Sequence, residues 1–268
     1  MNKYLQKRKN RYKTIIEKSD KKTLIVYFVL RALVILCLIR EIMLEDYQNA
    51  LLCILSLILF TIPTFVEKTF KLDLPNTLEI TILIFIFSAE ILGEINNFYG
   101  LFKNFDDILH TINGFLSASV GFSLVYLLNK NIESFYLSPL FVSLVAFCFS
   151  MTIGIAWEFF EYGMDTIFNL DMQKDTYINK INTVTLDETN SNKVVNLNEI
   201  DYIVLYDKNN NKITSINGYL DIGIIDTMED LIVNFIGALI YSVFGYLYII
   251  NNDKNKIAGK FVIKKNTI

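Results

Sequence analysis

The chain has 268 residues, of which 53% are hydrophobic, and a formal net charge of −3 with a mean hydropathy of +0.38. Its longest apolar stretches approach the roughly 20 residues that a helix needs to cross a bilayer, and only three prolines interrupt the chain. This composition excludes an ordinary soluble domain and predicts a polytopic membrane protein.

Apolar stretches recur along the chain and predict an all-α polytopic membrane protein with six transmembrane helices and a small outer loop that contains a β-hairpin. The six spans cover roughly residues 23–43, 49–66, 78–98, 105–128, 137–168 and 227–250. We divide the chain into a basic cytoplasmic N-terminus (1–22), spans one to five (23–168), an extracytoplasmic loop (169–226), span six (227–250) and a cytoplasmic tail (251–268).

Basic residues gather at the two ends of the chain and predict its orientation. Residues 1–22 hold nine Lys or Arg, and the tail after residue 250 holds five Lys. Cytoplasmic segments are enriched in Lys and Arg, and six spans return both ends to one side, so both termini are expected in the cytoplasm. The abundance of Asn, Lys and Ile indicates an AT-rich bacterial genome, so we expect the plasma membrane of a bacterium.

The 169–226 loop is the one sizeable soluble piece of the predicted chain. Residues 200–220, "IDYIVLYDKNNNKITSINGYL", place a polar turn between two runs of β-formers and predict a hairpin. Residues 176–186, "TYINKINTVTL", add a candidate strand. We expect an ordered cap over the outer mouth of the protein, with an extracytoplasmic ligand as a candidate partner.

Acidic side chains and the only histidine cluster at the predicted outer ends of spans three to six. These residues are Glu90 and Glu94; Asp106, Asp107 and His110; Glu158, Glu161 and Asp165; and Asp226, Asp230 and Asn234. Within each helix the spacing of three or four residues puts the polar groups on one stripe. The pattern predicts one polar pocket shared by four helices.

Simpler interpretations apply to part of this set. Aspartates at helix N-termini are favoured by capping and by the helix dipole, which explains Asp106 and Asp226 without a function. The same reasoning fails for Glu158, Glu161 and Asp165, which lie near a C-terminal end, where negative charge is disfavoured. Arg31 in span one either extends to the cytoplasmic surface or pairs with a buried carboxylate. The three cysteines fall in apolar stretches, as is typical of small core residues rather than of a disulfide set.

Four short motifs carry a resemblance to a known family over roughly residues 85–240. Their residues are Asp107, His110 and Gly114; Glu158, Glu161 and Tyr162; Gln173 and Asp175; and Asp226, Thr227, Asp230 and Gly237. Together they resemble the YjdF-like family of bacterial integral membrane proteins, and there is a fainter likeness to VanZ-like membrane proteins. The resemblance implies a membrane protein and brings no assigned activity. In compact relatives the last two motifs are nearly adjacent, whereas here about fifty residues separate them.

The residues favour a metal-assisted enzyme that acts on a lipid or cell-envelope substrate. Carboxylates with one imidazole suit Mg²⁺ or Mn²⁺ better than Zn²⁺. We expect Asp107, His110, Glu158 and Asp230 to bind the metal, with Glu161, as general base, and Asp226 as catalytic carboxylates.

Two alternatives stay open. A cation- or proton-coupled transporter also uses carboxylates within the membrane, although the charged residues stop in the outer half. A non-catalytic membrane scaffold would use the hairpin to bind a partner. We expect membrane lipids and no nucleic acid as partners.

Overall fold

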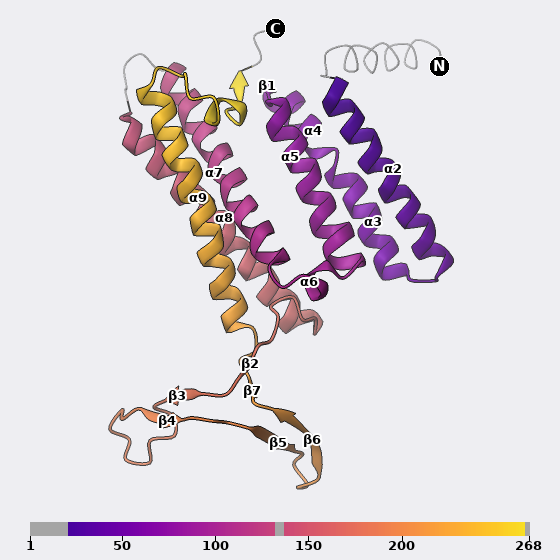
Figure 1. Ribbon diagram of the computed structural model, residues 1–268, viewed down its shortest axis with the longest axis vertical. Coiled ribbons are helices and arrows are strands. Elements are labelled where there is room, and N and C mark those ends of the chain that lie inside the picture. Colours follow the sequence, from indigo (N-terminus) through magenta and orange to yellow (C-terminus); the bar gives the residue numbers. More distant parts are fainter. Residues whose placement is uncertain (1–20, 132–136, 266–268) are drawn as a thin grey trace. The chain divides into compact units, whose positions relative to one another are not determined.

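The computed structural model describes residues 21–131 and 137–265, so the predicted basic N-terminus lies almost entirely outside the described residues. The chain divides into two units, and each is described by itself. The first unit runs to Gly154 and resumes at Ile232, and the second comprises Ile155–Leu231. Figure 1 shows helices throughout the first unit and short strands in the second.

Five helical segments of the described chain are long and apolar enough to cross a membrane. They are α2 (Lys21–Met43), α3 with α4 (Tyr47–Leu59 and Ile62–Phe70), α7 (Phe105–Asn131), α8 (Pro139–Phe168) and α9 (Ile224–Ile250). Only 17–39% of the residues in their apolar windows are buried, so most of this apolar surface faces outward. An outward apolar surface of this length is what a lipid environment requires. Five of the six predicted spans are therefore present as candidate spans.

The predicted third span, residues 78–98, is not one regular α-helix. Helix α5 (Asn76–Ile86) continues into a π-helix, η1 (Phe87–Ile95), and neither piece alone reaches the length of a span. The wide turn ends where Asn96 donates from its backbone N–H and its side-chain amide to the Ile91 carbonyl. The part of the chain that the structure describes therefore has five candidate spans, whereas the sequence predicted six. The sequence pattern did not reveal the change because apolar periodicity does not separate an α-helix from a short π-helix.

The close packing of α7 against α9 depends on two glycines of the first unit. A Cβ on Gly237 would lie 2.0 Å from the Thr111 carbonyl oxygen, and a Cβ on Gly114 would lie 2.2 Å from the Asn234 carbonyl oxygen. A fully buried core follows this contact toward the C-terminal ends of both helices. It consists of Ala118, Phe122, Ala238 and Tyr241 together with Val142 and Ala146 of α8. Small residues bring the backbones together here, as in other membrane helix pairs.

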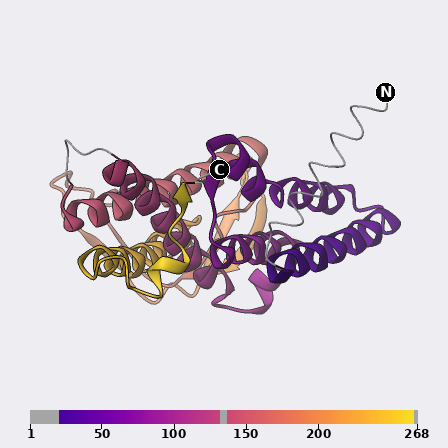
Figure 2. The ribbon, with the colours of Figure 1, turned by 90° about the horizontal axis from the view of Figure 1, so that it is seen from above.

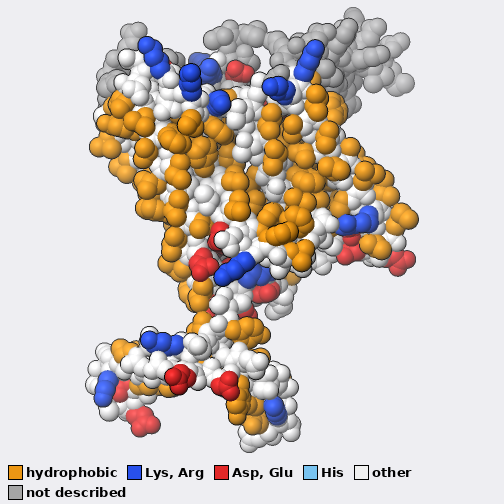
Figure 3. All heavy atoms as spheres, in the orientation of Figure 1, with side chains coloured by type: hydrophobic (Ala, Val, Ile, Leu, Met, Phe, Trp, Pro, Cys, Tyr) orange, Lys and Arg blue, Asp and Glu red, His pale blue; other side chains and the backbone are white. Residues whose placement is uncertain are grey.

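The first unit also has a second packed region. Val34 of α2, Cys53 of α3 and Leu83 of α5 are buried together with Phe60 and Ile91. Seen from above, α2 and α3 lie at one end of the first unit, while the first-unit parts of α8 and α9 lie at the other (Figure 2). Figure 3 shows apolar side chains over the helices of this unit, with Lys and Arg side chains at the end where α2 begins.

The predicted cytoplasmic tail is folded onto the helices. After the short helix η2 (Ala258–Lys260), Val262 and Ile263 are buried. The Ile263 backbone N–H donates to Ser123 Oγ at 2.9 Å. Strand β8 (Lys264–Lys265) then pairs antiparallel with β1 (Leu72–Asp73). The tail thus closes one end of the first unit.

The second unit contains three antiparallel strand pairs between the ends of α8 and α9. Strand β2 (Tyr177–Ile178) pairs with β7 (Tyr219–Leu220), and β3 (Ile181–Thr183) pairs with β4 (Val195–Leu197). Strands β5 (Tyr202–Tyr206) and β6 (Lys212–Asn217) form the predicted hairpin around the Asn-rich turn. The prediction of a hairpin is confirmed. The candidate strand in residues 176–186 appears as the two strands β2 and β3.

Candidate functional site

Three carboxylates meet in the second unit. Glu158 and Glu161 lie one turn apart on α8, and Asp230 lies one turn inside α9 from the Asp226 end. One oxygen from each lies within 4.8 Å of one from each of the others. The exposed fractions of Glu158, Glu161 and Asp230 are only 5%, 7% and 3%. We refer to these three residues as the carboxylate cluster.

Neighbouring polar groups orient the glutamates of the carboxylate cluster. Trp157 Nε1 donates to Glu161 Oε1 at 2.9 Å, one turn along the same helix. The side chains of Thr227 and Gln173 lie near that of Glu158. Gln173 Nε2 donates to Thr227 Oγ1 at 2.5 Å. The motifs between residues 158 and 230 thus each have a residue in or near this cluster.

Two further acids fix the segment that brings Gln173 to the cluster. Asp165 accepts the backbone N–H groups of Met172 and Gln173 at 2.6 and 2.9 Å. Asp226 Oδ2 accepts the Lys174 N–H at 2.8 Å. Charged acceptors make strong hydrogen bonds to backbone N–H groups, so these two acids hold the chain between α8 and strand β2 in place. Asp226, which was predicted as a catalytic carboxylate, thus binds and positions the backbone at Lys174.

The chemistry of the carboxylate cluster fits a hard divalent cation. Oxygen ligands from carboxylates are those that Mg²⁺, Mn²⁺ and Ca²⁺ prefer. Glu158 Oε2 is buried and has no hydrogen-bond partner in the part of the chain that the structure describes. Burying several ionised carboxylates side by side is costly unless a cation or a proton compensates their charge. The cluster thus offers carboxylate oxygens within 4.8 Å of one another, including one oxygen that has no hydrogen-bond partner among the described residues and can bind such an ion.

Asp106 and His110 lie together in the first unit, near the start of α7. His110 Nε2 is 3.5 Å from Asp106 Oδ1, and the exposed fraction of His110 is 9%. Asp107, a predicted metal ligand, is half-buried, and its backbone carbonyl accepts from Thr111 Oγ1 at 2.7 Å. The predicted grouping of Asp107 and His110 with Glu158 and Asp230 remains a prediction.

The other in-span polar residues have local partners in the first unit. Asn234 Oδ1 accepts from Asn113 Nδ2 at 3.4 Å, across the α7–α9 contact. Glu90 is half-buried in the π-helix, and Glu94 is exposed. Arg31 donates to Tyr27 Oη at 2.6 Å and lies 5.7 Å from the centre of that ring. Neither of the two alternatives for Arg31 anticipated this contact with an aromatic ring.

Sequence reasoning did not anticipate one part of the site. The assignment of Glu161 as general base stays a prediction; the structure brings Glu161 together with Glu158 and Asp230 within 4.8 Å. The predicted pocket included Asp165 without its contacts to the following segment, and Gln173 had no role beyond its motif. Contacts across such loops are not encoded in helical periodicity; the one available signal was that Gln173 and Asp226 belong to motifs that are nearly adjacent in compact relatives.

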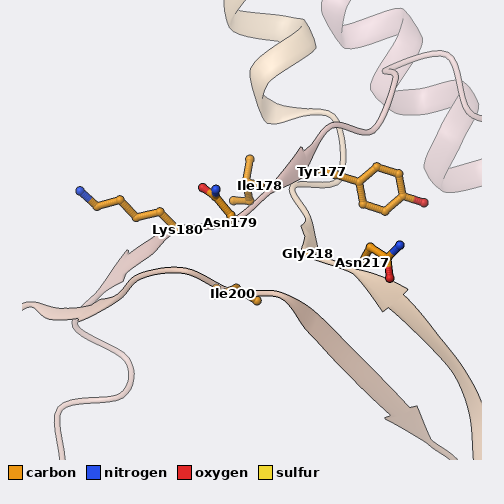
Figure 4. Close-up of a pocket in the computed structure, with 7 residues that line it drawn as sticks. All are labelled: Tyr177, Ile178, Asn179, Lys180, Ile200, Asn217 and Gly218. Carbon is orange, nitrogen blue, oxygen red and sulfur yellow. The ribbon is translucent and has the colours of Figure 1, made fainter.

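A pocket of about 480 Å³ lies among the strands of the second unit. It is lined by residues 177–180, Ile200, Asn217 and Gly218. Figure 4 shows the side chains of Tyr177 and Lys180 pointing away from each other. The pocket therefore does not gather its polar groups around one point, and an extracytoplasmic ligand there remains a prediction.

Comparison with known proteins places the chain in a family. Residues 23–251 match the family model described as "Predicted membrane protein (DUF2238)", so the chain belongs to this family of predicted membrane proteins. No curated protein and no solved structure matches the chain. The match covers all five candidate spans except the first two residues of α2.

Proposed function

We propose that this member of the DUF2238 membrane-protein family binds a divalent cation at its carboxylate cluster and uses it as an enzyme acting on a lipid or cell-envelope substrate. The observation that carries the proposal is the meeting of Glu158, Glu161 and Asp230 within 4.8 Å, all three buried. Ionisable groups buried in a membrane protein are costly and are retained for function.

Mg²⁺ and Mn²⁺ suit the cluster better than Zn²⁺ because its ligands are carboxylate oxygens. When bound, such an ion supplies Lewis-acid polarisation of a phosphoryl or carbonyl oxygen and acidification of a bound water. Trp157 keeps one oxygen of Glu161 oriented, and the polar side chains of Thr227 and Gln173 lie near Glu158. Glu161 is thus a ligand in this proposal, and the earlier assignment as general base is its alternative role.

Asp226 acts as a positioning residue here, because its carboxylate holds the Lys174 backbone. We also propose Asp107 and His110 as ligands, and measurements of cation binding test their role. If His110→Ala leaves cation binding unchanged, the two residues have no part in the site.

We also propose the location that the charge pattern predicts: a bacterial plasma membrane, with both termini cytoplasmic. This requires a sixth crossing, which α5 and η1 supply together, since they cover 20 consecutive residues, 76–95. Single cysteines at Asn209 and Lys256 in a cysteine-free background test it. A membrane-impermeant maleimide added to intact cells should label position 209 and not position 256. The reverse result, or labelling of both, contradicts the orientation.

The motif resemblance to YjdF-like proteins is consistent with this proposal. Glu158 and Asp230 come from two of the four motifs and meet in the carboxylate cluster, and Gln173 of a third motif donates to Thr227, three residues before Asp230. The fainter likeness to VanZ-like proteins adds no residue to the site.

The direct test measures cation binding without requiring a substrate. The purified protein is stripped with a chelator and titrated with Mn²⁺ while the free ion is followed by electron paramagnetic resonance. About one ion should bind per chain, and Asp230→Asn and Glu158→Gln should weaken binding more than ~10-fold. Glu229→Gln is the matched control, because Glu229 is exposed and adjacent to Asp230. Equal binding by all four proteins would refute the metal site.

The enzymatic half of the proposal has its own test. Vesicles of bacterial envelope lipids are incubated with the Mn²⁺-loaded protein, and the lipids are compared by mass spectrometry. A product formed by the wild type and by Glu229→Gln, and absent with Asp230→Asn, supports catalysis. Normal Mn²⁺ binding with no product from any envelope lipid argues for a cation-binding protein without this activity.

A transporter remains the second candidate because the first unit buries hydroxyl groups in its apolar core. Tyr241, Ser143 and Ser242 are buried, and their hydroxyls have no hydrogen-bond partner among the described residues. Buried hydroxyls of this kind hold water or a passing ion. Cation flux into proteoliposomes that falls with Tyr241→Phe but not with the more exposed Tyr246→Phe would favour transport over catalysis.

A further inference from the structure

Two of the three cysteines face each other across the helical hairpin formed by α2 and α3. The turn between these helices is centred on Glu45, and Cys37 and Cys53 each lie eight residues from it. Since both helices rise by ~1.5 Å per residue, equal distance from the turn puts the two thiols at the same level. Sequence reasoning interpreted the three cysteines as small core residues rather than as a disulfide set.

The two cysteines lie in one packed region of the hairpin. Cys53 has an exposed fraction of 0% and belongs to the buried core with Val34, and Cys37 packs against this core. Both cysteines are in the thiol form in the structure. The two thiols therefore share one buried region at one level of the hairpin.

A buried carboxylate accompanies the pair. Glu41, whose exposed fraction is 3%, lies one turn after Cys37, and its Oε1 is 3.9 Å from Cys37 Sγ. Arg40 holds this carboxylate in place, with Nη2 at 2.5 Å and Nε at 2.6 Å from the same oxygen. Arg40 Nη1 also donates to Asn96 Oδ1 at the end of the π-helix. A proton acceptor is thus fixed beside the more accessible thiol.

We propose that Cys37 and Cys53 are a redox-active dithiol that forms a reversible disulfide, joining α2 to α3. The oxidant is a second disulfide, carried by a small molecule or a protein. Cys37 gives its proton to Glu41 and attacks one sulfur of that disulfide, whose S–S bond breaks and releases a thiolate. Cys53 then attacks the Cys37 sulfur, the intramolecular S–S bond forms and the second thiolate leaves. Two electrons pass to the oxidant, and the two cysteine protons go to its two thiolates.

Cys148 provides an internal control. It is exposed on α8, whereas Cys53 is fully buried and Cys37 half-buried. An indiscriminate oxidant modifies the exposed thiol first, and a preformed dithiol reacts within itself. Two observations therefore distinguish a preformed dithiol from chance oxidation: which cysteine is oxidised first, and which cysteine it becomes bonded to.

The test uses the full-length protein in detergent or in native membranes. The reduced protein is treated with 4,4′-dithiodipyridine, an apolar disulfide, and remaining thiols are alkylated after acid quenching. Trypsin cleaves after Arg31, Arg40 and Lys68, so Cys37 and Cys53 fall in different peptides, residues 32–40 and 41–68. Mass spectrometry should find these two peptides joined and short of two hydrogen atoms, with Cys148 carrying a pyridylthio group or free. Reduction should separate the peptides.

Two outcomes overturn the proposal. One is the absence of the joined peptides when Cys148 is fully modified, and the other is joining of Cys148 to Cys37 or Cys53 as often as of these two to each other. Glu41→Gln tests the proton acceptor separately. It should slow formation of the Cys37–Cys53 bond by more than ~10-fold without changing the partner. An unchanged rate would remove Glu41 from the step.

Discussion

Neutralising one member of the carboxylate cluster should change stability in opposite directions with and without a divalent cation. In chelator, Glu158→Gln is expected to raise the unfolding temperature, because it removes a negative charge from a buried group of three. With millimolar Mg²⁺ or Mn²⁺ the wild type should become more stable, and Glu158→Gln should gain little. The sign reversal distinguishes an ion site from a purely structural cluster.

The magnitude follows from the spacing of the carboxylates. Glu158 and one ionised neighbour at 4.8 Å repel by about 3.5 kcal/mol at an effective dielectric constant of ~20. The substitution also removes the favourable interaction of the charged carboxylate with the nearby polar side chains of Thr227 and Gln173, a loss of about 1.5–3 kcal/mol that offsets part of this gain. We therefore expect a net stabilisation of about 0.5–2 kcal/mol in chelator, which is ~1–8 °C for a chain of this size. A cation at 100 times its dissociation constant should stabilise the wild type by about 2.7 kcal/mol.

Thermal unfolding of the detergent-solubilised protein, followed by circular dichroism, measures both shifts. Glu229→Gln makes the same charge change at an exposed neighbouring position and should move the transition by less than ~0.5 kcal/mol under either condition. Destabilisation by Glu158→Gln in chelator, together with an unchanged response to Mn²⁺, would refute the reasoning. It would mean that Glu158 contributes hydrogen bonds and no cation binding.

Three further predictions test the fold around the site. Gly237→Ala should lower the unfolding temperature by an amount corresponding to ~1–3 kcal/mol or more, because its Cβ would meet the Thr111 carbonyl at 2.0 Å, whereas Gly163→Ala, with nothing within 4 Å, should be neutral. Asp165→Asn should expose the segment after α8 to limited proteolysis, because that carboxylate binds two backbone N–H groups; unchanged cleavage contradicts this role. Hydrogen bonds from its own loop hold the pKa of Asp187 below its ordinary value, so this loop should be ordered at neutral pH and lose protection from hydrogen exchange as the pH falls below the usual aspartate range. Loss of protection as the pH rises would contradict this prediction, because a lowered pKa stabilises the loop only above that pKa.

Much of the fold could be predicted because it depends on local sequence. Long apolar stretches with few charges correctly indicated five candidate spans, and family membership agrees that the chain is a membrane protein. The hairpin at residues 200–220 was also correct, because β-forming runs around an Asn-rich turn specify it locally. Periodicity also placed Glu158 and Glu161 on one helix face.

Other features depend on contacts between distant segments. The basic residues after residue 250 predicted a cytoplasmic tail but not its contact with the helices. In the structure, the Ile263 backbone N–H donates to Ser123 Oγ, 140 residues earlier. The predicted third span was wrong as a single α-helix, because the widened turn around Gly93 accommodates the ring of Tyr99, which follows it in the chain. Neither arrangement changes the hydropathy pattern on which span prediction rests.

The sequence by itself determined which segments are apolar, which helices carry acids and where the hairpin turns, since each depends on neighbouring residues. Only the tertiary structure decided which side chains meet: Glu158 and Glu161 with Asp230, Gln173 with Thr227, and Cys37 with the core that contains Cys53. The physical reason is that helical spacing fixes directions within one helix, whereas the packing of small residues and the course of the loops fix which faces of different helices come together.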